Sequence, residues 1–369
     1  PTGRAAKRMT EATGYEAKTI HRLLEVSGGI EDGDSSHFEK NEDNPIEADA
    51  VILDEMSMVD IHLMYSLLKA IVPGTRLILV GDSNQLPSVG PGNVLKDIID
   101  SKAFSVVRLS KIYRQAESSH IVLNAHKINA GELITLDNKN KDFFFFEKKD
   151  VRSVMGALVY LVKTRLPEYI GASPFEIQVL TPMRKGELGV EHLNEVLQYY
   201  LNPASESKKE KEGRTGVFRE GDKVMQVKNN YKLEWKITNA KGFSIEEGLG
   251  VFNGDMGIIK QINTYSERIT VVFDENREAE YPFSSLDELE LAYAITIHKS
   301  QGSEYPAVVL PLLSGPPILC NRNLLYTAIT RAQKCVAIAG RQSMVEQMIH
   351  NETEQKRYSG LNDCLKEGL

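Results

Sequence analysis

The amino-acid sequence predicts an α/β protein with two doubly wound parallel sheets and a small β-barrel inserted into the second. Short apolar runs rich in Val, Ile and Leu recur along the 369 residues, and glycine or polar residues follow each run, as expected of buried parallel strands. Helical patterns lie between these runs, which is the alternation typical of α/β domains. Between Val217 and Tyr281 the pattern changes to short alternating strands separated by Gly, Asn and Asp turns, which indicates the barrel.

The individual elements follow from the same patterns. The predicted parallel strands are Ala50–Leu53, Leu77–Val80, Ile177–Leu180, Ala307–Leu310 and Val336–Ala339. The clearest predicted helices are Asp60–Ile71, Ser118–Ala130, Val190–Tyr200 and Asn323–Arg331. The clearest predicted strands of the barrel are Lys223–Val227, Gly257–Ile262 and Ile269–Phe273. Two charged stretches without periodicity, residues 28–44 and 204–213, are expected to be surface loops or disordered.

Composition limits the classes of function. The formal net charge is -7, from 44 basic and 51 acidic residues, so any surface for nucleic acid must be a local one. The 3 cysteines suit neither a disulfide framework nor a zinc site, which favours a reducing cytoplasm. The most apolar late stretch, Pro306 to Leu319, is broken by prolines and is too short to cross a bilayer, so no membrane segment is expected.

Two adjacent carboxylates, Asp54 and Glu55, follow the strand Ala50–Leu53. Ligands of open α/β sheets bind at the edge where parallel strands end, so this pair is a candidate site. In a nucleotide hydrolase the first acid would hold Mg²⁺, and the second would orient or deprotonate the attacking water. Taken alone, such a pair is more often a strand exit with two solvated acids.

Three further side chains suit the chemistry of phosphate. Gln85 follows the strand Leu77–Val80, and its neutral amide can contact a γ-phosphate and a water molecule at once. Arg114 and Arg331 stand in apolar or small surroundings, and a guanidinium offers a fixed fork of donors to phosphate oxygens. A single arginine of this kind is more often part of a surface ion pair.

The order of these segments resembles that of the motifs in RecD-like superfamily-one DNA helicases. The matching segments, in chain order, are Pro1–Lys7 (motif Ia), Thr19–Leu24, Asp54–Asp60 (motif II), Gly81–Gly92 (motif III), Tyr113–Gln115 (motif IV), Leu180–Arg184, Ala294–Glu304 (motif V) and Leu325–Ala332 (motif VI). The segments Gly221–Gln226 and Val251–Gly257 resemble the SH3-like 2B domain of this family. Each motif alone is a weak signal, whereas chance does not readily produce the whole set in one order.

The resemblance implies two RecA-like domains of the P-loop NTPase type. The expected boundaries are residues 1–112 for the first motor domain, 113–216 with 282–345 for the second, 217–281 for the SH3-like insertion and 346–369 for a C-terminal tail. The implied activity is that of an ATP-dependent helicase that uses Mg²⁺ and moves 5′ to 3′ on single-stranded DNA. DNA repair or recombination is the implied setting, and any nuclease or recombination partners stay open.

Roles for individual residues follow from the same resemblance. Asp54 would serve Mg²⁺, Glu55 would activate water, Gln85 would sense the γ-phosphate, and Arg114 and Arg331 would stabilise the transferred charge. Gly302 and Glu304 would lie beside the nucleotide, with Glu304 near the ribose. The implied DNA contacts are Thr2, Gly3, Thr19 and His21 in the first domain, and Thr181, Thr296, His298 and Lys299 in the second. Hydroxyls, backbone N–H groups and a few cations suit a sequence-independent grip on phosphates, although His298 and Lys299 have the alternative of capping a strand.

The sequence departs from the family in one respect, because these 369 residues contain no Gly-x-x-x-x-Gly-Lys-[Ser/Thr] loop. In the family that loop stands immediately before motif Ia, so we expect this chain to be a fragment that hydrolyses ATP poorly or not at all. Two alternatives stay open: a non-catalytic nucleic-acid-binding or assembly module, and the helicase part of a conjugative relaxase or of a Pif1-like motor. The aromatic run Phe143–Phe146 and Trp235 are expected to pack rather than to stack on bases.

Overall fold

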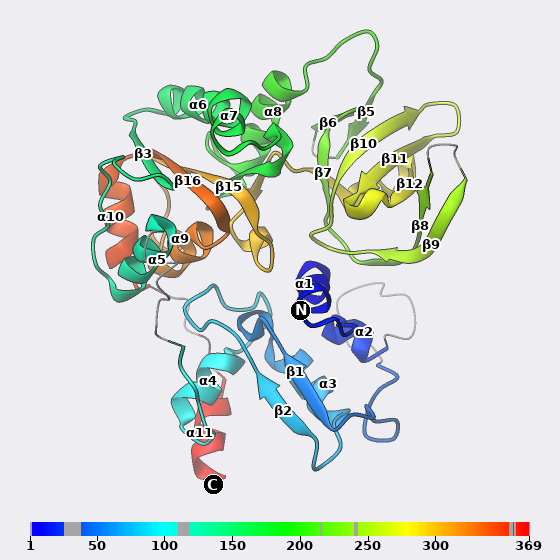
Figure 1. Ribbon diagram of the computed structural model, residues 1–369, viewed down its shortest axis with the longest axis vertical. Helices are drawn as coiled ribbons and strands as arrows, with labels where there is room; N and C mark the ends of the chain where they lie inside the picture. The colour runs from blue at the N-terminus through cyan, green and yellow to red at the C-terminus, as the bar shows by residue number, and fades with distance from the viewer. Residues whose placement is uncertain are drawn as a thin grey trace. The chain divides into compact units, whose positions relative to one another are not determined.

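The structure is a computed structural model, and it describes residues 2–25, 38–109, 119–214, 216–239, 243–353, 357 and 359–368. The chain divides into two compact units, which are described separately (Figure 1). The first contains Pro1–Arg114, Gln301–Ser303 and Thr353–Leu369, and the second contains Gln115–Ser300 and Glu304–Glu352. Each unit is therefore assembled from segments that are distant in the sequence.

The first unit is built on two parallel strands, β1 (Ala50–Leu53) and β2 (Arg76–Leu79), which lie side by side in Figure 1. Helices α3 (Ile61–Lys69) and α4 (Val94–Ser101) contribute with β1 to one hydrophobic core, in which Val51 and Leu53 are buried. Ile52, Ile78 and Val80 are exposed on the opposite side. The strands were expected to be buried on both faces, but among the described residues only one face is covered.

Three more helices belong to the first unit, and side chains cap two of them. They are α1 (Gly3–Thr13), α2 (Ile20–Leu23) and α11 (Leu361–Glu367). The Thr2 hydroxyl accepts a hydrogen bond from the Ala5 N–H at the start of α1, and Gly14 ends that helix with a left-handed backbone. The C-terminal helix α11 packs beside α4, where the Ser359 hydroxyl donates to the Asp97 carboxylate (2.5 Å).

A five-stranded parallel sheet forms the base of the second unit, in the order β14-β4-β15-β16-β3. Its strands are β3 (Phe143–Glu147), β4 (Ile177–Thr181), β14 (Ala294–Thr296), β15 (Tyr305–Leu312) and β16 (Ala332–Gly340). Helices lie on both faces, as expected of a doubly wound sheet (Figure 1). These helices are α5 (His120–Ala130), α6 (Val151–Tyr160), α7 (Leu166–Ile170), α8 (Val190–Leu201), α9 (Arg322–Ile329) and α10 (Gln342–His350), and a π-helical turn, Leu161–Arg165, joins α6 to α7.

The insertion after α8 is an antiparallel barrel-like sheet in the order β13-β7-β10-β11-β12-β8-β9, preceded by the hairpin β5-β6. The strands of the insertion are β5 (Glu210–Gly213), β6 (Gly216–Arg219), β7 (Lys223–Gln226), β8 (Asn230–Thr238), β9 (Ser244–Val251), β10 (Met256–Asn263), β11 (Arg268–Phe273), β12 (Glu278–Pro282) and β13 (Leu289–Leu291). Short 3-10 turns complete the second unit at Pro174–Glu176, Asp274–Asn276, Phe283–Glu288 and His298–Ser300.

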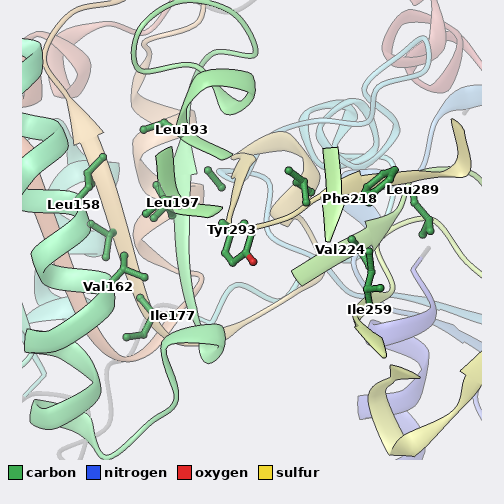
Figure 2. Packing of buried hydrophobic residues seen from close by; sticks show 14 of the residues in the cluster. Leu158, Val162, Ile177, Leu193, Leu197, Phe218, Val224, Ile259, Leu289 and Tyr293 are labelled. Carbon is green, nitrogen blue, oxygen red and sulfur yellow. The ribbon is translucent and has the colours of Figure 1, made fainter. Parts of the chain in front are cut away.

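One continuous hydrophobic core joins the parallel sheet of the second unit to its insertion. Figure 2 shows Leu158 and Ile177 on the side of the parallel sheet, Phe218 and Val224 on the side of the insertion, and Tyr293 between them. All of these side chains are nearly or fully inaccessible to solvent. The insertion is therefore packed onto the parallel sheet as part of one body, rather than attached to it by a flexible linker.

The predicted fold class is confirmed, with two α/β sheets and an inserted β-barrel. The five predicted parallel strands correspond to β1, β2, β4, β15 and β16. The aromatic run beginning at Phe143 is the edge strand β3, in which Phe143 and Phe145 are buried and the alternate rings are partly buried. No helix among the described residues is both long and apolar enough to cross a bilayer.

Candidate nucleotide and DNA sites

The acid pair Asp54–Glu55 lies where β1 and β2 end together. Leu53 is opposite Leu79 in the parallel register, and the chain beyond the strands stays in contact, because the Met56 N–H donates to the Val80 carbonyl (3.0 Å). Gly81 makes this approach possible, since a Cβ atom at that position would lie 2.8 Å from the Met56 nitrogen. The predicted residues Asp54, Glu55 and Gln85 thus follow the ends of two adjacent strands, at the edge where α/β sheets bind ligands.

Glu55 has an unusual backbone. Its φ of 54° and ψ of 42° are in the left-handed region, which costs a residue with a side chain roughly 1–2 kcal/mol. The Asp54 carboxylate partly compensates by accepting the Glu55 N–H at 2.8 Å. Strained residues held by their surroundings are concentrated at functional sites, so this conformation supports a functional role for the pair.

Gln85 is positioned by Asp82, which lies in the same loop after β2. The Gln85 backbone N–H donates to the Asp82 carbonyl (3.3 Å), and its side-chain nitrogen donates to the Asp82 carboxylate (3.4 Å). The side-chain oxygen of Gln85 is buried and has no hydrogen-bond partner within the described structure. Leaving a buried acceptor unpaired costs about 1–3 kcal/mol, so this atom is prepared to receive a hydrogen bond from a ligand or a water molecule.

Two side chains that the sequence did not single out hold the loop that follows Gln85. The buried side chain of Gln301 donates to the Leu86 carbonyl (2.7 Å). The Arg357 guanidinium donates to the carbonyls of Ser88, Gly90 and Gly92, and also to the Ser88 hydroxyl. Both are bonds within the first unit, although their partners are more than 200 residues apart in the sequence, so local sequence patterns gave no signal for either.

Replacing Arg357 with alanine is expected to loosen the loop from Ser88 to Gly92. Hydrogen bonds from a charged donor contribute about 1.5–3 kcal/mol each, so amide exchange in this loop should accelerate roughly 10- to 100-fold. Hydrogen–deuterium exchange measured by mass spectrometry would test this, with Lys366→Ala on the exposed side of α11 as the control. Unchanged exchange in folded Arg357→Ala would show that the loop does not depend on this arginine.

The predicted DNA contacts of the first unit lie at the starts of α1 and α2. Thr2 caps α1, Gly3 is the first residue of that helix, and the Thr19 hydroxyl accepts the Arg22 N–H at the start of α2 (3.3 Å). The His21 ring lies 6.0 Å from the Phe38 ring between centroids, and partial burial lowers the pKa of His21. Gly302 belongs to this unit and approaches Thr2, because a Cβ atom on Gly302 would lie 2.6 Å from the Thr2 hydroxyl.

In the second unit the predicted DNA contacts Thr181 and Thr296 are brought together. They are directly opposite each other at the carboxyl ends of β4 and β14. Thr181 is fully buried, and its hydroxyl donates to the Leu188 carbonyl (2.7 Å). Thr181 therefore orders the loop that carries Arg184, and its hydroxyl is already engaged within the protein. Thr296 is half-buried and accepts a hydrogen bond from the Lys299 N–H (3.3 Å).

Lys299 lies just after β14 and is paired with an acid. Its ammonium is 2.8 Å from Glu290 on β13, and the other oxygen of Glu290 is 2.7 Å from the guanidinium of Arg184. Burial opposes ionisation of Glu290, but the bonds from Lys299 and Arg184 outweigh it and keep the pKa of Glu290 below its usual value. The neighbouring His298 is exposed. Both residues belong to the 3-10 turn His298–Ser300, which begins two residues after the end of β14.

The predicted nucleotide contacts of the second unit lie at the amino-terminal ends of its parallel strands, whereas Thr181 and Thr296 lie at the carboxyl ends. Glu304 and Arg331 immediately precede β15 and β16, and the Tyr305 N–H donates to the Arg331 carbonyl (2.8 Å). Arg331 is 4% exposed, and its Nε atom donates to the Thr327 carbonyl (3.2 Å). Glu304 is exposed and accepts a hydrogen bond from Gln333 (3.1 Å). Arg114, the remaining predicted contact, lies outside the described residues.

The folds of the two units, with acids and an amide after the ends of parallel strands, are those of the RecA-like class of the P-loop NTPase type. Sequence comparison agrees with that class in three segments. Residues 1–91 match the AAA domain family, residues 193–273 match the SH3 domain of ATP-dependent RecD-like DNA helicases, and residues 291–339 match the UvrD-like helicase C-terminal domain.

Two curated relatives align with most of the chain. It is 36% identical over 340 residues to the ATP-dependent RecD2 DNA helicase of Deinococcus radiodurans, an alignment that covers 92% of this chain and 42% of that protein. It is 30% identical over 392 residues to the RecBCD enzyme subunit RecD of Mycolicibacterium smegmatis, covering 99% of this chain and 65% of that protein. The chain belongs to the RecD-like superfamily-one helicases, as the order of its motifs predicted, and it spans less than two thirds of the length of these relatives.

Solved structures confirm the fold independently. The structure of Bacteroides Pif1 bound to single-stranded DNA aligns with 93% of this chain and 88% of that chain, with a TM-score of 0.51 and 17% identity. The structure of Pif1 helicase from Bacteroides with ADP-AlF3 and single-stranded DNA aligns with 92% of this chain and 81% of that chain, with a TM-score of 0.50 and 20% identity. At these identities the likeness concerns the fold alone.

Proposed function

We propose that the protein is an ATP-driven DNA helicase that translocates 5′ to 3′ on single-stranded DNA, in DNA repair or recombination. The observation that carries this proposal is that Asp54, Glu55 and Gln85 follow the ends of two adjacent parallel strands, β1 and β2. Its context is the ordered motif set and the names of the relatives, an ATP-dependent RecD2 helicase and subunits of the RecBCD enzyme. The free cysteines are compatible with a reducing cytoplasm, which is the compartment we propose.

In this proposal each residue at the nucleotide site has a separate task. Glu55 takes the proton of the attacking water. Gln85 holds that water through its unpaired oxygen, which accepts a hydrogen bond, or senses the γ-phosphate by donating a side-chain N–H to it. Arg114 and Arg331 stabilise charge on the transferred phosphoryl group, while Gly302 and Glu304 lie along the nucleotide. Asp54 fits Mg²⁺ because it offers a carboxylate oxygen, a hard ligand, at the sheet edge, and the ion would neutralise phosphate charge.

The proposed DNA contacts do not require a positive surface over the whole molecule. Thr2, Gly3, Thr19 and His21 in the first unit would contact the phosphate backbone through hydroxyl, N–H and imidazole groups. Thr296, His298 and Lys299 would do so in the second unit, with Thr181 acting through the loop that it orders. Contacts of this kind bind the backbone without reading bases, which suits a translocase.

Single-strand-stimulated ATP hydrolysis is the decisive measurement. These 369 residues contain no phosphate-binding loop, so we expect them to bind single-stranded DNA but to hydrolyse ATP poorly by themselves. The same chain with a Gly-x-x-x-x-Gly-Lys-[Ser/Thr] segment from a RecD-like relative joined before Pro1 should hydrolyse ATP, and single-stranded DNA should stimulate it. Measuring both proteins side by side distinguishes a loss of ATP hydrolysis caused by the absent loop from one caused by a defect elsewhere.

The opposite result favours the second candidate, a non-catalytic nucleic-acid-binding module. If both proteins bind single-stranded DNA and neither hydrolyses ATP, the roles given to Glu55, Gln85 and Arg331 should be withdrawn. Directionality is tested separately, with partial duplexes that carry a single-stranded tail at only one end, because a 5′ to 3′ motor unwinds the duplex with the 5′ tail.

A further inference from the structure

Glu290 joins two cations at the edge of the second unit that is proposed to contact DNA. Its two carboxylate oxygens have separate partners, the Arg184 guanidinium at 2.7 Å and the Lys299 ammonium at 2.8 Å. The three residues come from three segments: the loop after β4, strand β13, and the turn after β14. An acid thus occupies the donors that a phosphate group would use, with one oxygen for each cation, as two oxygens of a phosphate would bind them.

The local charge balance shows what this pairing does to the surface. Two acids offset the cations Lys299 and Arg184. They are Glu290, which contacts both cations, and Glu191, which is 3.3 Å from Arg184. The four side chains together carry no net charge. Most of the free energy with which proteins bind DNA phosphates comes from cations that displace counterions, so a neutralised cluster contributes little until its acids are displaced.

The pairing is partly protected from solvent, and the acid is the less mobile member. The Glu290 side chain is 17% exposed, against 30% for Lys299 and 46% for Arg184. Strand β13 is anchored by Leu289 and Leu291, both buried, and it pairs with β7. Because the backbone of Glu290 is fixed, while Lys299 and Arg184 have long side chains on a turn and a loop, the cations are the groups able to change partner.

We propose that Glu290 is a built-in competitor of DNA, which holds Lys299 and Arg184 when DNA is absent and yields them to a backbone phosphate when DNA binds. This inference rests on the proposed DNA-translocating function and assigns a new residue to it. In this exchange the cations keep an anionic partner, but the largely buried Glu290 carboxylate loses its partners, which offsets part of the free energy gained from the phosphate. Such a near-balanced exchange weakens the grip on each phosphate, which suits a protein that must release and rebind the strand as it moves.

The test is the binding of a fluorescein-labelled oligothymidylate by this chain without nucleotide, followed by fluorescence anisotropy at several salt concentrations. Glu290→Gln keeps the shape and a hydrogen-bond acceptor but removes the charge. We expect this variant to bind roughly tenfold more tightly than the parent. The plot of log affinity against log salt should steepen by about 0.7 to 1.4, for one or two additional phosphate contacts on a single strand.

Glu195→Gln is the matched control, because it removes the same charge from an exposed position on α8 whose contact is with His192 at 3.6 Å. Its affinity should change less than about twofold. A further comparison tests whether the gain in DNA affinity depends on the two cations. The gain from Glu290→Gln should shrink when Lys299 and Arg184 are both replaced by alanine, because the cations that the variant would release are then missing. Circular dichroism and thermal melting verify that each variant is folded.

Three results would overturn the inference. Folded Glu290→Gln that binds no better than the parent, or more weakly, would show that the acid only orients the cations. An equal gain from Glu195→Gln would show a general effect of net charge. If neither the parent nor Glu290→Gln binds single-stranded DNA even at low salt, the proposed function fails together with this inference, whereas binding by the parent without a gain in the variant removes the inference alone.

Discussion

ATP turnover should fall about a thousandfold when Glu55 is replaced by glutamine in a form of the protein that carries a phosphate-binding loop, within the range of roughly 10² to 10⁴ typical for loss of a general base. Glutamine has nearly the same size as glutamate and can still orient a water molecule, but it cannot take the proton. Nucleotide binding should therefore be retained. The expected signature is a lower kcat with an unchanged dissociation constant for ATP.

Single-strand-stimulated phosphate release measures turnover, and a fluorescent ATP analogue measures binding. Glu47→Gln provides the matched control, because Glu47 is an exposed acid just before β1 and no role is assigned to it. Turnover retained by Glu55→Gln would refute the general-base assignment. A loss of both binding and turnover would instead indicate that the left-handed conformation of Glu55 is needed to shape the site.

The second large effect concerns stability. Asp222 is fully buried where the insertion meets the parallel sheet, and donors surround its carboxylate. The side chains of Gln198 (2.6 Å), Asn202 (2.7 Å) and Tyr293 (2.9 Å) and the Arg219 N–H (2.6 Å) all donate to it. Burial raises the pKa of Asp222, and the side-chain donors act in the opposite direction. The network connects α8, the insertion and the segment before β14 in one polar cluster.

Replacing Asp222 with alanine is expected to lower the free energy of unfolding of the second unit by about 3–5 kcal/mol, because it leaves several buried donors without an acceptor. Asp222→Asn should cost less, since one oxygen still accepts. Urea denaturation followed by circular dichroism would measure both. Glu246→Ala on the exposed strand β9 should stay within about 0.5 kcal/mol of the parent. A loss below about 1 kcal/mol in Asp222→Ala would show that water replaces the network.

The tertiary structure also bears on the prediction that Trp235 packs rather than stacks on bases. One face of the Trp235 ring lies against Gly248, where a Cβ atom would be 2.3 Å from the ring, and the Arg277 guanidinium lies 5.5 Å from its centroid. These contacts occupy part of a half-buried ring that would otherwise be available for stacking on a base. The preference for packing at Trp235 agrees with these contacts, although its partners are 13 and 42 residues away in the sequence.

The sequence by itself determined the fold class, the family and the positions of the chemical groups at strand ends. Hydrophobic periodicity and the residues that end strands are local properties, so Asp54, Glu55 and Gln85 could be located from neighbours alone. The tertiary structure decided which groups are free to act. It engages the Thr181 hydroxyl with Leu188, pairs Lys299 with Glu290, and attaches Gln301 and Arg357 to the loop after Gln85. These contacts join groups that are distant in the sequence or that depend on burial, and burial and pairing arise only when the chain is packed.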